Sequence, residues 1–405
     1  MPHILDTLKE RGFIAQITFE DELYKLLANE RVTFYTGFDP TADSLTAGHV
    51  IPIMAHMHLQ RAGHRPIVLV GGGTGMIGDP SDRTEMRKFL DEEQLAKNLA
   101  GIRAQLGRFL NFENDAALMV NNADWLLDLN YVDFLREIGV HFSVNRMLSA
   151  DCYKSRYEKG LTFLEFNYML MQAYDFLELN RRYGCTVQYG GDDQWSNILA
   201  GADLIRRKEQ RDAFAMTAPL LTTSDGVKMG KSAAGALWID AERTSPYDYF
   251  QYWRNIDDTG VRAAMLRLTF LSIDEINGLL APGANINEAK RIMAHAITAI
   301  VHGEDAADAA VQMAASLFGG DASNAPTTQL PREEVLADAR IVKLMVSCGL
   351  AKSIGEARRL VEGGGVAANN ATVAAADAVA SEADFAGEGL LLRKGKKVYH
   401  RIQLI

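Results

Sequence analysis

The feature that most constrains the fold of this 405-residue sequence is a strand, turn and helix signature over residues 32–49. The run from Val32 to Thr36 is β-branched and aromatic, as is typical of a buried strand. The chain then turns at Gly37 and at Asp39-Pro40, and a helix is predicted to begin near Gly48-His49. Because the first N–H groups of a helix are unpaired and carry partial positive charge, such a unit can hold phosphate. The segment therefore predicts an α/β fold with a phosphate site at a strand end.

A second element far along the chain strengthens this interpretation. Lys228-Met229-Gly230-Lys231-Ser232 forms a polar, glycine-containing loop after Leu220-Leu221. Two lysines three residues apart can neutralise a polyphosphate, while residues 32–49 seat the nucleotide. Together the two elements indicate ATP.

Composition limits the classes of partner. About half of the residues (48%) are apolar, which predicts a large core and two or three domains. The net charge is −10, so any contact with a nucleic acid must be local. Residues 338–405 differ, with ten Lys and Arg against seven Asp and Glu. Their basic clusters, at Arg358-Arg359 and over residues 393–397, would suit a phosphate backbone.

Other residue types argue against alternative chemistries. The three cysteines, Cys152, Cys185 and Cys348, are too widely spaced for a zinc pattern or a disulfide framework, so we expect buried thiols in a reducing compartment. The spacing of His56, His58 and His64 puts them on different faces, which favours structural or surface histidines over metal ligands. Without an apolar signal segment or a long apolar run, the sequence predicts a cytoplasmic protein that does not enter membranes.

A glycine-rich segment offers a competing hypothesis. Residues 73–78 match the Gly-x-Gly-x-x-Gly dinucleotide pattern and follow the apolar strand 67–70. However, the ribose-binding acid of that pattern should end another strand about twenty residues on, whereas residues 83–110 have helical periodicity. Asp79-Pro80 would also stop a helix. We therefore expect these glycines to allow close approach of a substrate, and we keep a dinucleotide-dependent oxidoreductase as the alternative.

Two further segments carry polar groups suited to a small substrate. In the predicted helix over 160–179, Tyr168, Gln172 and Asp175 fall on one stripe beside an apolar face. Residues 187–197 form another strand, turn and helix, in which Gly191, an acidic pair and Gln194 could hold ribose hydroxyls and a carboxylate or ammonium group.

Taken together, residues 35–49, 168–179, 191–195 and 228–232 resemble the bacterial tyrosyl-tRNA synthetases, a family of class I synthetases, essentially end to end. The resemblance implies an α/β fold. It consists of a Rossmann-like parallel-sheet catalytic domain with an inserted dimerisation region, a helical domain, and a small α+β C-terminal RNA-binding domain of the S-four type. The expected segments are 1–225 (catalytic), 226–246 (lysine loop), 247–318 (helical), 319–336 (linker) and 337–405 (C-terminal).

The resemblance also implies chemistry. The carboxylate of L-tyrosine would attack the α-phosphorus of ATP, and the adenylate would then esterify the 3' end of tRNA(Tyr). ATP would bring Mg²⁺, no metal would be held by the protein alone, and the protein would be a homodimer. A non-catalytic RNA-binding protein with the same scaffold is a further alternative.

The residues implied for each role are these. Tyrosine would contact Tyr35, Asp79, Tyr168, Gln172, Asp175 and Gln194. ATP would contact Gly37, Asp39, Thr41, Gly48, His49, Gly191, Asp193, Lys228 and Lys231. Catalysis would involve Thr46, His49, Lys228 and Lys231. RNA would contact Arg358, Arg359, Lys394, Lys396 and Lys397.

The sequence departs from the family pattern at a few positions. Thr46 stands where the family has the first histidine of its His-Ile-Gly-His motif, and Gly230 stands where the Lys-Met-Ser-Lys-Ser motif has serine. Asp192 adds a negative charge near the expected ribose site. The alanine-rich stretch 366–380 dilutes the C-terminal pattern.

Overall fold

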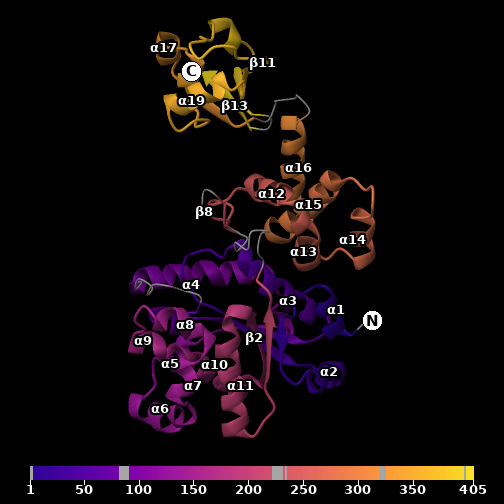
Figure 1. Ribbon diagram of the computed structural model, residues 1–405, viewed down its shortest axis with the longest axis vertical. Helices are drawn as coiled ribbons and strands as arrows, with labels where there is room; N and C mark the ends of the chain where they lie inside the picture. The colour runs from indigo at the N-terminus through magenta and orange to yellow at the C-terminus, as the bar shows by residue number, and fades with distance from the viewer. Residues whose placement is uncertain (1–2, 82–90, 221–230, 233–234, 319–324, 396–397) are drawn as a thin grey trace. The chain divides into compact units, whose positions relative to one another are not determined.

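The computed structural model describes residues 3–81, 91–220, 231–232, 235–318, 325–395 and 398–405 (Figure 1). The chain divides into two compact units, Met1–Gly303 and Glu304–Ile405. Each unit has its own sheet and its own core.

The first unit is organised around a six-stranded sheet. Its strands are β1 (Gln16–Ile17), β2 (Thr33–Phe38), β3 (Arg65–Val70), β4 (Leu118–Asn121), β5 (Cys185–Gly191) and β6 (Phe214–Ala218), in the order β1-β6-β5-β2-β3-β4. All neighbouring pairs from β6 to β4 are parallel, and β1 is antiparallel to β6. The chain order reverses between β2 and β5, which is where ligands of open α/β sheets bind, at the carboxyl ends of the strands.

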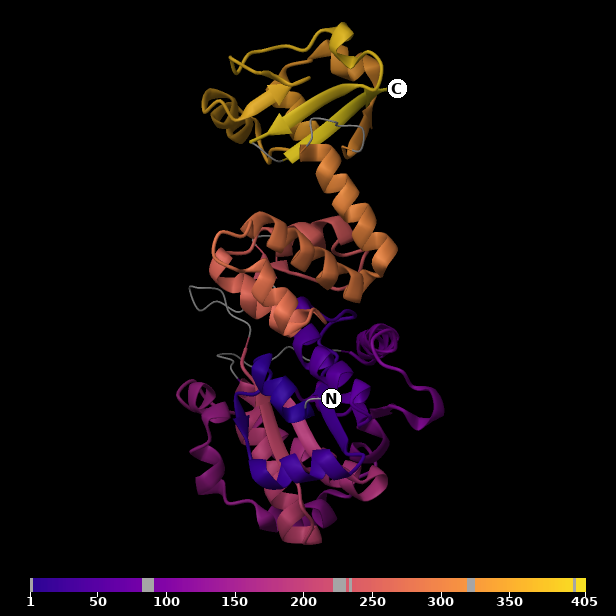
Figure 2. The same cartoon turned by 90° about the vertical axis from the view of Figure 1, so that its right-hand side faces the viewer.

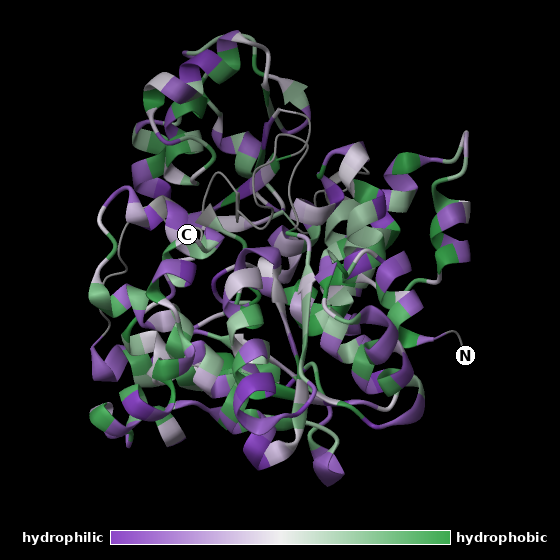
Figure 3. Cartoon of the chain, turned by 60° about the horizontal axis from the view of Figure 1, so that its bottom comes forward, coloured by the Kyte–Doolittle hydropathy of each residue, from purple (hydrophilic) through white to green (hydrophobic). Residues whose placement is uncertain are grey.

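Helices cover the sheet because its central strands are apolar on both faces. They are α1 (Ile4–Glu10), α2 (Glu20–Asn29), α3 (Val50–Arg61), α4 (Glu92–Leu106), α5 (Ala123–Leu126), α6 (Tyr131–Glu137), α7 (Val144–Leu148), α8 (Asp151–Tyr157), α9 (Phe163–Phe166), α10 (Tyr168–Tyr183) and α11 (Trp195–Glu209). Figure 3 shows hydrophobic and hydrophilic segments alternating along such helices, which is the pattern of one buried and one exposed face. Pro52 lies in the first turn of α3, where its missing N–H costs little.

A helical section completes the first unit. It contains α12 (Pro246–Arg254), α13 (Asp258–Leu268), α14 (Ile273–Leu279) and α15 (Ile286–His302). Helix α12 starts after Ser245, whose side chain accepts a hydrogen bond from the Asp248 N–H, and Pro246 follows it as the first helical residue. The buried Arg11 donates to the carbonyl groups of Leu266 and Thr269, both at 3.0 Å, and so connects this section to the N-terminal helix.

The second unit combines helices with a five-stranded sheet. Figure 2 shows the broad strands of this sheet in yellow. The strands are β9 (Thr327–Leu330), β10 (Val366–Ala368), β11 (Ala371–Thr372), β12 (Leu390–Lys394) and β13 (Val398–Leu404), in the order β11-β10-β12-β13-β9. The helices are α16 (Glu304–Phe318), α17 (Arg332–Ala337), α18 (Ile341–Ser347) and α19 (Ile354–Glu362). The expected α/β fold with a small α+β domain at the C-terminus is confirmed.

One boundary needs correction. Residues 319–336 were expected to form a linker, but in the described part of this range β9 pairs in parallel with β13 and α17 follows it. The C-terminal domain therefore begins before residue 337. The sequence misleads here because β9 is a short, polar edge strand whose stability comes from backbone pairing with a distant partner.

Histidines and cysteines behave as structural residues. His56 and His58 are buried, and burial lowers the pKa of each imidazole to about 4. All three cysteines are buried, as predicted. Within the described ranges, we find neither a helix with the length and apolarity to cross a membrane nor a His, Cys, Asp and Glu cluster suited to a metal ion.

Candidate active site

The carboxyl ends of β2, β3 and β5 meet the start of α3 and one face of α10. Tyr35 on β2 is the register partner of Ile67 on β3 and of Gln188 on β5. Its ring also packs against Phe176 of α10, with ring centroids 5.3 Å apart. Residues far apart in sequence therefore converge at the point where the strand order reverses.

One end of the site contains a buried phenol and a buried carboxyl group. Tyr35 and Asp175 are each 1% exposed. Asp175 accepts hydrogen bonds from Asn122 Nδ2 at 2.9 Å and from Trp125 Nε1 at 2.7 Å. Burial nevertheless raises the pKa of Asp175 to about 8, because the charged form loses its hydration.

Three polar atoms around this end have no hydrogen-bond partner in the part of the chain that the structure describes. They are the Tyr35 hydroxyl, Gln172 Oε1 and Gln188 Oε1. Buried polar atoms are nearly always paired, so such a group of unpaired atoms indicates a place for a polar ligand. Tyr35 and Gln172 were expected here, whereas Gln188 was not.

Asn122 and Trp125 were also missed by the sequence interpretation. They follow β4, and only the packing of α10 brings Asp175 to them. A usable signal was present, because polar residues directly after a parallel strand lie at the ligand-binding edge of a sheet.

A hydrogen-bond chain extends from Asp175 towards residues 39–49, which we call the phosphate turn. Asn122 Nδ2 also donates to Thr74 Oγ1 at 2.9 Å, and Thr74 Oγ1 donates to Asp39 Oδ1 at 2.8 Å. The Tyr168 hydroxyl donates to Asp39 Oδ2 at 2.8 Å. Asp39, expected at the nucleotide, and Tyr168, expected at the amino acid, are therefore in direct contact.

Two other expected tyrosine contacts are also brought together. Gln194 Nε2 donates to Asp79 Oδ2 at 2.6 Å, although the two residues lie on different loops. Asp79 Oδ1 accepts the N–H of Ser81, which fixes the carboxylate on its own turn. This pair forms another polar group within the site.

The glycine-rich segment after β3 is packed by the protein itself. A Cβ on Gly71 would lie 2.2 Å from Asp39 Oδ1, and one on Gly72 would lie 2.3 Å from Asn121 Oδ1. Thr74–Met76 forms a single 3-10 turn, and the described residues 77–81 that follow it contain no α-helix that could bind a dinucleotide. Gly71 and Gly72 therefore admit neighbouring side chains of the protein close to the backbone.

Thr46, the residue that departs from the family motif, lies against His49 in the phosphate turn. His49 Nδ1 accepts the backbone N–H of Thr46 at 3.1 Å and lies 3.0 Å from Thr46 Oγ1. A neutral imidazole that accepts at Nδ1 must carry its proton on Nε2. Thr46 therefore orients His49 as a hydrogen-bond donor at the start of the helix.

The described part of the lysine loop, which we call the lysine segment (residues 231–232 and 235–239), is attached to the same turn. Lys231–Ser232 (β7) pairs with Gly235–Ala236 (β8), and the Ala47 N–H then donates to Leu237 O at 2.9 Å. Ile239 N donates to Leu45 O at 3.1 Å, so the chain after β8 runs antiparallel to residues 45–47. Lys228 lies outside the described residues.

Two charged residues discussed above, Asp192 and Lys394, form hydrogen bonds within the protein. Asp192 accepts hydrogen bonds from Gln16 Nε2 at 2.7 Å and from Thr217 Oγ1 at 2.8 Å, so its carboxylate is engaged by β1 and β6. Lys394 donates to Glu356 Oε1 at 2.9 Å and to Leu350 O at 2.8 Å within its own domain.

The other basic residues expected at RNA fall into two groups. Arg358 and Arg359 are exposed on α19. Lys396 and Lys397 lie outside the described residues.

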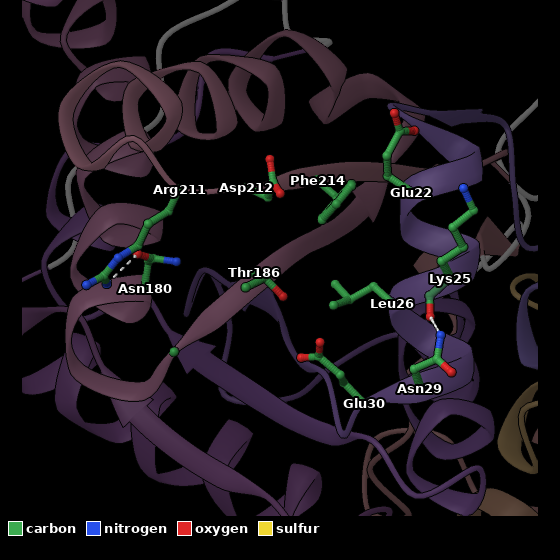
Figure 4. Close-up of a pocket in the computed structure, with 11 residues that line it drawn as sticks. Glu22, Lys25, Leu26, Asn29, Glu30, Asn180, Thr186, Arg211, Asp212 and Phe214 are labelled. Carbon is green, nitrogen blue, oxygen red and sulfur yellow. Dashed lines mark hydrogen bonds between the residues drawn. The ribbon is translucent and has the colours of Figure 1, made fainter.

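A separate cavity of about 510 Å³ lies at the other end of the strands, beside the amino ends of β5 and β6. Figure 4 shows its wall from α2, with Glu22, Lys25 and Asn29, facing Thr186 and Phe214 at the amino ends of β5 and β6. It has no part in the site at the carboxyl ends.

A parallel sheet whose strand order reverses beside a helix start, with a lysine-bearing strand attached to that helix start, agrees with the class I synthetase fold that the family model identifies. The family model "tRNA synthetases class I (W and Y)" matches residues 27–319. The model "Tyrosine--tRNA ligase SYY-like C-terminal domain" matches residues 320–402.

Curated relatives narrow the class. The chain is 55% identical over 405 residues to the tyrosine–tRNA ligase of Clostridium kluyveri, covering 99% of both chains. It is 54% identical over 407 residues to that of Clostridium beijerinckii, covering 100% of both. The chain belongs to the tyrosine–tRNA ligase family, and neither the oxidoreductase nor the non-catalytic alternative is supported.

Solved structures agree on the fold. A C-terminally truncated mitochondrial tyrosyl-tRNA synthetase from Aspergillus nidulans aligns with a TM-score of 0.71 at 28% identity, over 78% of this chain and 95% of that one. The tyrosyl-tRNA synthetase of Archaeoglobus fulgidus, complexed with L-tyrosine, aligns with a TM-score of 0.58 at 18% identity, over 76% and 99%.

Proposed function

We propose that this chain activates L-tyrosine with ATP and transfers the tyrosyl group to tRNA(Tyr). The observation that carries the proposal is the buried pair of Tyr35 and Asp175, next to unpaired polar atoms at the reversal point of the sheet. This group of buried polar atoms suits a substrate with a hydroxyl group at the end of an aromatic ring. Family membership is consistent with it.

Selection of tyrosine would follow from hydrogen-bond satisfaction. The substrate hydroxyl would pair with the Tyr35 hydroxyl and the Asp175 carboxyl group, while phenylalanine would leave both unpaired in a buried site. At the other end, Asp79, Tyr168 and Gln172 would bind the α-ammonium group, and Gln194 would lie near the carboxylate. Two observations support these roles: Asp79 accepts a hydrogen bond from Gln194, and Tyr168 and Gln172 lie on the same helix, α10.

In the first step a carboxylate oxygen of tyrosine forms a bond to the α-phosphorus as the bond to pyrophosphate breaks. No proton needs to be removed, so the protein would act by positioning and by stabilising charge. His49, a donor at Nε2, would contact phosphate together with the backbone near Gly48. Lys228 and Lys231 would neutralise pyrophosphate, Thr46 would orient His49, and Mg²⁺ would arrive with ATP.

The nucleotide would also contact Gly37, Asp39, Thr41, Gly191 and Asp193. In the second step the terminal ribose hydroxyl of tRNA would form an ester with the tyrosyl carbonyl carbon of the adenylate, as the bond from that carbon to AMP breaks and AMP leaves. Arg358 and Arg359 are proposed RNA contacts, because they are exposed on one helix of the C-terminal domain. Since tRNA is the proposed substrate, we place the activity in the cytoplasm.

We also propose a homodimer. A group of large apolar side chains is exposed on the segment from α5 to α7, and we call it the apolar face: Leu127, Tyr131, Val132, Leu135, Val140 and Val144. Exposed apolar patches of this kind mark protein interfaces.

The test is exchange of labelled pyrophosphate into ATP by the full chain. Tyrosine should support exchange and phenylalanine should not, and tRNA from bacteria should then accept tyrosine. Exchange that is absent, or equal with the two amino acids, would refute the proposal.

A further inference from the structure

Asp43 lies in the phosphate turn between two cations that have different surroundings. The Arg243 guanidinium forms an ion pair with Asp43 and also stacks on Trp238, with its Cζ 4.4 Å from the ring centroid. Lys97 Nζ lies 3.5 Å from the same carboxylate, but its side chain is 67% exposed. Arg243 connects Asp43 to the segment that bears Trp238, whereas Lys97 connects it to α4.

The Trp238 segment leads directly to Lys231. Trp238 forms a β-bridge with Thr46, and Leu237 accepts the N–H of Ala47 at 2.9 Å. Ala236, the residue before Leu237, is the strand partner of Lys231. Antiparallel partners have Cα atoms about 5 Å apart, so the position of residues 236–238 sets the position of the Lys231 backbone.

The backbone pairing alone is short. It rests on the hydrogen bonds of Ala47 and Ile239 on either side of the Thr46 bridge, and a pairing of this length is weak by itself. Arg243 adds a side-chain connection, because one planar group contacts the carboxylate of the turn and the ring of the bridge residue.

We propose that Arg243 is a positioning residue for the activation step, which holds the segment bearing Lys231 against the Thr46–His49 turn. It does not touch the substrates; it acts through Trp238 and Asp43. The inference rests on the proposed function, since the reaction that it assists is the attack on ATP.

The test compares R243Q with the matched variant K97Q, which removes the other cation from the same carboxylate. R243Q should lower kcat for pyrophosphate exchange about tenfold, because small misplacements of reacting groups are costly. The dissociation constant for tyrosine, measured by equilibrium dialysis without ATP, should stay unchanged. K97Q should match the wild type in both measurements, and R243K should fall between R243Q and the wild type because it keeps the ion pair and stacks less well.

A double-mutant cycle separates positioning from general stability. R243Q in a D43N background should lower exchange by much less than in the wild type. Unchanged exchange in R243Q, equal losses in R243Q and K97Q, weaker tyrosine binding in R243Q, or additive effects with D43N would each overturn the inference. Failure of the wild type to exchange pyrophosphate would instead refute the proposed function.

Discussion

Tyr35 has a buried hydroxyl group without a hydrogen-bond partner among the described residues, which is costly for a folded protein. Tyr189, on the neighbouring strand, is equally buried, but its hydroxyl donates to Phe13 O at 2.9 Å. The two tyrosines thus provide a matched comparison between a hydroxyl left for a ligand and one used for stability.

Replacing Tyr35 by Phe should leave the free energy of unfolding unchanged or slightly higher, and it should lower kcat/KM for tyrosine about tenfold, as expected for one lost hydrogen bond. The preference for tyrosine over phenylalanine should fall equally. In Y189F, by contrast, unfolding should become easier by about 1 kcal/mol while the preference is kept. Denaturant unfolding measures the stability of each variant, and pyrophosphate exchange with tyrosine and with phenylalanine measures its selectivity. A destabilised Y35F with unchanged selectivity would contradict this assignment.

Asp175 predicts a pH dependence whose sign can be worked out. The pKa of its carboxyl group is about 8 in the folded protein, against 3.8 for an ordinary aspartate. The folded state therefore binds more protons than the unfolded state between these values, so this contribution to stability is full below pH 4 and is lost as the pH rises to 8.

In the absence of tyrosine, the stability of the wild type relative to D175N should therefore decline from pH 5 to pH 8. The readout is the difference in midpoint of urea unfolding between the two proteins at several pH values. A constant difference across this range would show that Asp175 does not titrate as described.

Helix α4 supports the phosphate turn from behind. Asn98 Nδ2 donates to Pro40 O at 2.8 Å, and Gln105 Oε1 accepts the Leu45 N–H at 2.8 Å. Both side chains are almost fully buried, and Gly101 lies between them on the same face. A Cβ on Gly101 would lie 2.0 Å from Asp43 O, so only glycine permits this contact.

Replacing Gly101 by Ala should push α4 away from the turn, lowering stability by about 1–3 kcal/mol and raising KM for ATP. The control is G278A in α14, where nothing lies within 4 Å of the new Cβ. That variant should gain up to about 1 kcal/mol from helix propensity, with no kinetic change. The measurements are thermal unfolding and KM for ATP. A G101A variant with unchanged stability and unchanged KM would contradict the close packing of α4 against the turn.

At the scale of the whole molecule, the proposed dimer depends on the apolar face. Val140 is 73% exposed, so V140D should not disturb the fold of one subunit. It should raise the dimer dissociation constant at least about tenfold, because a buried charge at an interface is unpaired. V379D, at a 64% exposed position in the C-terminal unit, is the control. Sedimentation velocity should show monomers for V140D and dimers for the wild type and V379D. An unchanged dimer in V140D would exclude the apolar face as the interface.

Much of the site could be predicted because its elements are local. Strand ends, turns and helix starts around Tyr35, Gly191 and His49 follow from nearest neighbours along the chain. By contrast, two contacts of the site join segments that are distant in sequence: Asp79 with Gln194, and Leu237 with Ala47. The internal hydrogen bonds of Asp192 and Lys394 also depend on residues far along the chain, so a local pattern does not contain them.

The sequence by itself determined the α/β fold class, the phosphate turn and most of the residue types of the site, because these depend on local patterns and on motif order. Only the tertiary structure decided which partners those residues take. Asn122 and Trp125 reach Asp175, and β9 joins the C-terminal sheet, through pairings across the fold. Such pairings depend on how layers of helix and strand pack, and no short window of sequence contains that information.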